Sequence, residues 1–125
     1  MPNVNPSFTS TPYTPDRLIG GDLKLVTESV TLALGQNLLR GALLGKITGS
    51  GEYVLSLAAA LDGSEVPVAV LVADTNATTG ATVAGIYLAG EFNENAITFG
   101  AGHTAASVKD ALRNLNIYLK SPVPA

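Results

Sequence analysis

The last third of the chain constrains the fold most, because only there do a strand, a glycine hinge and a capped helix follow one another with clear boundaries. The glycine-rich segment 100–102 separates an apolar run that ends at Phe99 from a helical pattern. Thr104 is a good N-cap, since its hydroxyl can accept a hydrogen bond from an amide of the first turn. Apolar residues recur at helical spacing from Ala105 to Leu115. The sequence therefore predicts one helix over 105–115.

The rest of the chain is typical of short strands separated by turn residues. Strands are predicted over 42–48, 52–57 and 66–73. An earlier strand contains Leu25 and Val26, and a bulge near these two residues explains why its apolar alternation slips by one position. Residues 82–89 and 91–99 are expected to form a hairpin bent at Gly90, and Asn116 is expected to end the helix in the left-handed conformation. The fold class predicted is mainly β, a small β barrel or sandwich-like domain of residues 18–125 with one short C-terminal α-helix.

Residues 1–17 form a different zone, with four of the seven prolines of the chain. Proline removes a backbone donor and restricts the residue before it, so this segment cannot form a helix. We expect an extended N-terminal arm. It carries two aromatic residues, Phe8 and Tyr13. The arm is either a tail with two incidental rings or a segment that orders on a partner by placing its rings in pockets.

Charge is unusually sparse in this chain. Charged residues make up 14% of it, against about 25% in an average soluble domain. Segments 53–61 and 66–73 have no charge. Both faces of the second segment are apolar, so we expect both of its faces to be covered. In a chain this small, other subunits can supply that cover, although a neutral Thr/Ser/Ala surface is the alternative. We predict self-association, with subunit contacts at Tyr53, Leu55, Val68 and Val70.

Composition also excludes several classes of partner. The net charge is −3 and the seven Lys and Arg residues are scattered along the sequence, so no basic stripe is expected and no nucleic acid is predicted as a partner. No apolar run reaches about 18 residues, so no membrane partner is predicted. The chain has no cysteine, and its N-terminus lacks the pattern of a secretory signal. We expect it to act in the cytoplasm or in a particle assembled there.

Residues that could carry chemistry are few, and none makes a convincing set. His103 is the only histidine, and there is no cysteine for it to activate. Glu91 and Glu94, three apart on a strand, would point to opposite faces. Loop 74–80 departs from a calcium loop, because its glycine is at the seventh position and Gly85 stands where a bidentate Glu is needed. We predict no catalytic, metal-binding or cofactor-binding residues and no enzymatic activity.

Several short motifs, taken in their order and spacing, resemble one protein family. They are LIGGD at 18–22, GQNLLRG at 35–41, LGKI at 44–47, DGS at 62–64 and the segment 90–113. Together they are similar to the head decoration proteins of tailed phages, the lambda-type capsid-stabilising family. The resemblance runs from about Leu18 to Leu119 and leaves out the first 17 residues.

The resemblance implies a structural virion protein. In that family, three copies form a compact knob over a three-fold position of the expanded shell and clamp neighbouring capsid subunits, and extended arms are known. The implied partners are the major capsid protein and the chain itself as a homotrimer, on the outer surface of a capsid assembled in the host cytoplasm. Phe8, Tyr13 and Leu18 are then the expected capsid-binding arm residues. A tail or baseplate accessory module, or a small trimeric β-barrel enzyme with sites between subunits, are the alternatives.

Overall fold

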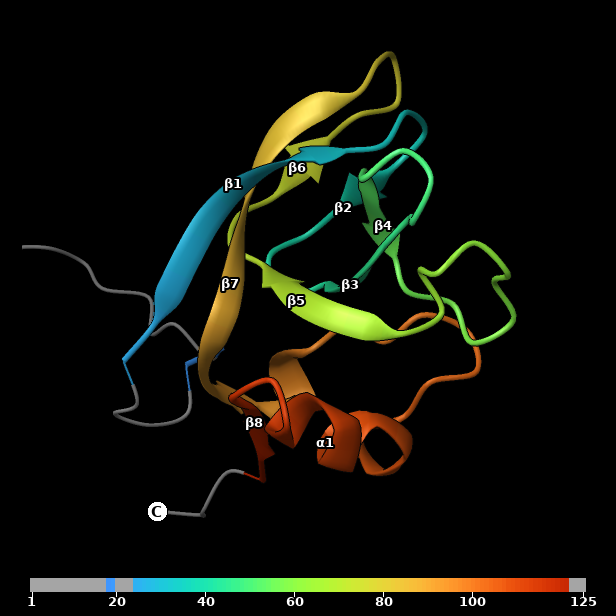
Figure 1. Cartoon of the computed structure of the whole chain (residues 1–125). Helices are drawn as coiled ribbons and strands as arrows, with labels where there is room; N and C mark the ends of the chain where they lie inside the picture. Colours follow the sequence, from blue (N-terminus) through green and yellow to red (C-terminus); the bar gives the residue numbers. More distant parts are fainter. Residues whose placement is uncertain (1–17, 20–23, 122–125) are drawn as a thin grey trace, which may run out of the picture.

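The computed structural model describes residues 18–19 and 24–121, so the arm predicted at 1–17 lies outside the described residues. Eight strands and one α-helix make up the described part of the chain (Figure 1). The elements are β1 Val26–Leu32, β2 Asn37–Leu38, β3 Leu43–Lys46, β4 Tyr53–Leu55, β5 Pro67–Leu71, β6 Thr75–Asn76, β7 Thr82–Asn93, a 3₁₀ turn Glu94–Ala96, α1 Ala105–Arg113 and β8 Ile117–Lys120.

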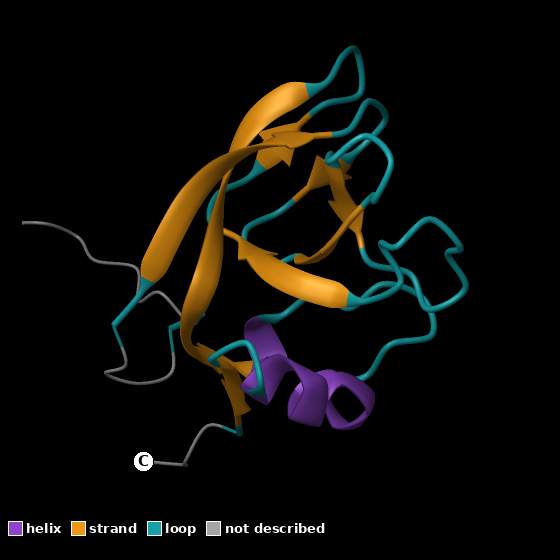
Figure 2. Cartoon of the chain, in the orientation of Figure 1, coloured by secondary structure: helices purple, strands orange, loops and turns teal. Residues whose placement is uncertain are grey.

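Five of the strands close into a barrel. The main sheet has the order β1-β4-β3-β5-β7-β8, and β1 also pairs with β7, which joins the two sides. β8 lies outside this ring as a parallel partner of the end of β7. The helix lies against one end of the barrel, beside β8 (Figure 2). The predicted fold class is therefore confirmed, and the bulge near Leu25 and Val26 is found one residue later, between Val26 and Thr27.

The hairpin predicted at Gly90 is wrong, because β7 runs through this residue as one strand of twelve residues. Gly90 has a φ of 152°. A Cβ atom there would lie 2.6 Å from Leu25 Cδ2 and 2.9 Å from Phe92 Cζ. The glycine thus marks a close approach of side chains to the strand, a use that sequence alone cannot distinguish from a turn. β7 ends at Asn93, so the second predicted strand is replaced by the 3₁₀ turn and a loop.

The predicted helix is confirmed, with a slightly earlier end at Arg113. Its N-terminus is a reciprocal capping box: Ser107 N donates to Thr104 Oγ1 at 3.1 Å, and Thr104 N donates to Ser107 Oγ at 2.9 Å. The amides of the N-cap residue Thr104 and of Ser107 in the first turn are thereby satisfied. Asn116 has a φ of 65°, so the left-handed residue expected after the helix is present and returns the chain to the sheet.

Two apolar clusters hold the barrel, and β5 contributes to both. One cluster lies between the barrel and the pair α1–β8, and includes Val70, Phe92 and Leu112. The other is inside the barrel, and includes Ala69 and Leu71. Both faces of β5 are therefore covered, as its sequence predicted, but the cover comes from the same chain. This packing leaves only Val68 of β5, which is partly buried, with side-chain surface for a subunit contact.

Leu112→Ala should lower the free energy of unfolding by about 2–5 kcal/mol, because the Leu112 side chain is fully buried and its removal leaves a cavity. Leu115→Ala is the matched control, since Leu115 follows the same helix but is 41% exposed; it should cost under about 1 kcal/mol. Urea unfolding of both variants measures the difference. Equal losses would contradict the burial of the Leu112 face of α1.

Candidate functional site

The predicted capsid-binding residues lie partly outside and partly inside the described chain. Phe8 and Tyr13 lie outside the described residues. Leu18 is 2% exposed and belongs to the cluster between the barrel and α1. Its side chain fills the chain's own core, so it has no free surface with which to contact a capsid protein in this conformation.

The four predicted subunit-contact residues divide between core and surface. Val70 is fully buried and Tyr53 is 9% exposed, so both serve the fold of the single chain. Burial raises the pKa of the Tyr53 phenol, and the nearby Glu28 carboxylate adds to that rise. Leu55 and Val68 are only partly buried and pack at the margin of the barrel core. Only these last two keep side-chain surface for another subunit.

His103 has a structural role that the sequence did not indicate. The Ser56 hydroxyl donates to the carbonyl oxygen of Ser64 at 2.6 Å, and His103 Nε2 lies 3.1 Å from the same hydroxyl. Because the single hydroxyl proton is already donated, the ring nitrogen acts as the donor. A general base would instead accept the serine proton, and Ser56 is fully buried. The pair ties three segments together and does not form an activated nucleophile.

Two glycines make this junction possible. A Cβ atom on Gly100 would collide with the carbonyl oxygen of Ser56, and one on Gly45 would collide with the carbonyl oxygen of Ser64. The backbones therefore approach too closely for any side chain. The loop beyond is held by Asp62, whose carboxylate accepts from the Ser64 amide and hydroxyl. These hydrogen bonds lower the pKa of the Asp62 carboxyl. The bond from the Ser64 hydroxyl is the larger cause, and the bond from the Ser64 amide is the second.

Exposed apolar side chains are numerous for so small a domain. Leu61, in the loop after β4, is 99% exposed, Val83 is 72% exposed and Leu39 is 65% exposed. The further members of this group are Leu25, Val26, Leu34, Leu57, Val66 and Leu115. Scattered single residues of this kind are normal on a surface, so exposure alone assigns none of them to a partner.

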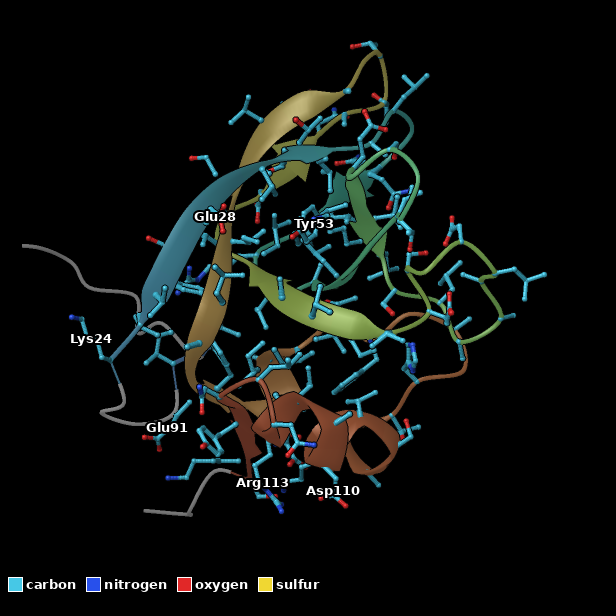
Figure 3. The ribbon with its side chains drawn as sticks, in the orientation of Figure 1. Lys24, Glu28, Tyr53, Glu91, Asp110 and Arg113 are labelled. Carbon is cyan, nitrogen blue, oxygen red and sulfur yellow. The ribbon has the colours of Figure 1, made fainter. Side chains whose placement is uncertain are left out.

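The end of the molecule that carries α1 and β8 gathers charge as well. Lys109, Arg113 and Lys120 line one groove of about 410 Å³ together with Glu91. Figure 3 places Glu91, Arg113 and Asp110 at this end. Sequence reasoning missed the group because it treated the basic residues as scattered. Lys109 and Arg113 are four residues apart and therefore lie on one face of the helix. This spacing was the signal in the sequence that could have indicated a basic helix face.

The same end holds the first described residues of the chain. Asn93 N donates to Leu18 O at 2.7 Å, and Ile19 pairs with Phe92 in an antiparallel bridge. β8 pairs with residues 90–93 of β7 as well. The base of the predicted arm and the groove therefore lie at the same end of the barrel.

Two further classes of site are not found in the part of the chain that the structure describes. Residues 18–19 and 24–121 contain no group of three or more His, Cys, Asp or Glu side chains placed to hold a metal ion. None of the helices within these ranges has the length and apolar character needed to cross a membrane.

Residues 7–118 match the family model of the bacteriophage lambda head decoration protein D, and the chain belongs to this family. It is thus a phage head protein with a capsid decoration role, located on the virion capsid. No curated protein matches the chain. The match begins at residue 7, so it extends into the arm, whereas the recognised motifs begin at Leu18.

Gly100→Ala should lower the free energy of unfolding by about 1–3 kcal/mol or more, because the added methyl would overlap a backbone carbonyl that cannot move aside easily. Gly49→Ala is the control: a Cβ there meets nothing within 4 Å, so stability should change by less than about 0.5 kcal/mol. Thermal and denaturant unfolding measure both. A neutral Gly100→Ala would mean that the two segments do not approach as described.

Proposed function

We propose that this protein binds the outer surface of the expanded phage capsid as a homotrimer at three-fold positions and thereby stabilises the head. The observation that carries the proposal is the family match over residues 7–118. The resembled family acts in this way, and its partner is the major capsid protein. Assembly on the shell in the host cytoplasm is part of this proposal, and the same family membership supports it.

The physical basis of stabilisation in this proposal is multivalency. One arm bound to the shell through a few side chains gives a weak contact. Three arms on one rigid knob make the second and third contacts intramolecular, which raises the avidity by about 10² or more. A knob that spans several capsid subunits then resists their separation. The closed barrel supports this role, because each subunit would carry its arm on a barrel whose core clusters are formed within one chain.

Phe8 and Tyr13 are the arm residues proposed to contact the capsid protein. Leu18 takes a different place in the proposal. Its buried side chain and its hydrogen bond to Asn93 fix the base of the arm to the end of β7. The arm is thereby directed from a defined point, which reduces the conformational entropy lost when it binds.

Self-association rests on surface composition. Charged residues are few in the whole chain, and nine large apolar side chains are exposed on the described part of the single chain. Burial of such side chains between subunits would be favourable by about 25 cal/mol for each Å² of apolar surface. Leu55 and Val68 remain the proposed contacts, whereas Tyr53 and Val70 serve the core.

The free protein should scatter light with three times the 12.7 kDa mass of one chain at micromolar concentration, because exposed apolar residues on a surface with few charges favour association. Multi-angle light scattering after size exclusion gives the mass directly. A single species of one chain's mass would contradict the trimer in free solution and leave trimer formation to the shell.

Deletion of residues 1–15 should leave the melting temperature within a few degrees, because the described core begins at Leu18. The same deletion should weaken binding to expanded, undecorated heads severely, since it removes one contact from every subunit of a multivalent knob. Phe8→Ala and Tyr13→Ala should each reproduce part of the loss.

His103→Ala, assayed at a temperature where it is folded, is the control and should bind like the parent protein, because His103 hydrogen-bonds within the chain. Co-sedimentation with heads measures binding for every variant. Equal binding by the truncated and intact proteins would move the interface from the arm to the barrel.

A further inference from the structure

Three of the seven basic residues of the chain converge on the groove between α1 and β8. Each of the three already has one carboxylate partner on the chain. Lys109 Nζ lies 3.4 Å from Glu94 Oε1, Arg113 Nη2 lies 3.3 Å from Asp110 Oδ1, and Lys120 Nζ lies 2.9 Å from Glu91 Oε1. In this structure the three cations therefore lie around the groove with a carboxylate near each of them.

The pairs leave the cations able to bind a further carboxylate. The Arg113 side chain is 57% exposed and the Lys120 side chain is 52% exposed. A lysine ammonium has three donors and an arginine guanidinium has five, so one partner does not saturate either. Exposed ion pairs of this kind contribute only about 0–1 kcal/mol each. A partner's carboxylate can therefore join or replace the one already present at little cost.

We propose that this groove binds an extended, carboxylate-bearing segment of the major capsid protein. The inference rests on the proposed function and adds a second contact to that of the arm. Complementary charge is the first argument, because three cations and one carboxylate line the groove. Position is the second argument. Leu18 and β8 pair with the two edges of the same segment of β7, so the base of the arm and the groove lie at the same end of the barrel.

The composition of the groove favours a protein segment over a nucleic acid. A phosphate backbone requires a continuous basic stripe, whereas the groove lining has only three basic residues, with Glu91 among them. Tyr118 and Leu119 add an apolar wall, which suits the aliphatic part of an extended peptide. A groove of about 410 Å³ is also far larger than a single carboxylate group.

The double variant Arg113→Glu/Lys120→Glu should weaken binding to expanded heads by about ten- to hundredfold, since each subunit of the knob loses its groove contact. The difference from the parent protein should shrink between about 0.05 M and 0.5 M salt, where screening becomes strong. Lys46→Glu changes one charge at an exposed position at the end of β3 and serves as control. It should bind like the parent, and all variants should keep the parent's melting temperature within a few degrees.

Carbodiimide cross-linking identifies the partner, because it joins an amine only to a carboxylate in contact with it. On decorated heads, Lys109 and Lys120 should be joined to Asp or Glu residues of the capsid protein. The link between Lys120 and Glu91 within the chain is the internal positive control. Links from these lysines only to other copies of this chain, or double-variant binding equal to that of the parent, would overturn the inference.

The two proposals fail in different ways. If the parent protein does not bind expanded heads, the proposed function is refuted. If the parent binds and loses affinity on arm deletion, while the groove variant binds normally, the capsid role stands and only the groove contact is refuted.

Discussion

The fold depends on the backbone pairing of one strand, β7. It forms seven antiparallel residue pairs with β1, which close the barrel, and it also pairs with β5 on its other edge. From Gly90 onward the same strand pairs with β8, and its residue Phe92 pairs with Ile19. The two apolar clusters meet at this strand as well, because Ile86 faces the barrel interior while Tyr87 and Phe92 face α1 and β8. Hydrogen bonding and apolar burial therefore converge on twelve residues.

Local signals in the sequence predicted local structure well. Thr104 predicted the helix start because a cap is set by residues within one turn, and Asn116 predicted the turn after the helix because few residues other than glycine adopt a positive φ readily. Gly90 failed because a glycine looks the same in a turn and in a strand that another side chain approaches. The close approaches at Gly45 and Gly100 join segments far apart in the chain, so no local pattern could reveal them.

The candidate site was predictable only in part, for the same reason. Apolar cover on both faces of β5 was expected from its residues, but whether that cover is the same chain or another subunit depends on where α1 and β8 pack. The basic groove was missed because Lys120 joins the helix residues only through the turn at Asn116. Family membership, in contrast, was predicted from short motifs. Each motif alone is weak, but their order and spacing together indicated the family that the match over residues 7–118 shows.

The attachment of Leu18 to β7 has a mechanical consequence. A pull on the chain before Leu18 is resisted first by the buried Leu18 side chain and by the bond from Asn93 N to Leu18 O. The load then passes into β7, which shares it among β1, β5 and β8 through their ladders. Tension applied at Leu18 would thus reach the pairings of several strands through the single strand β7.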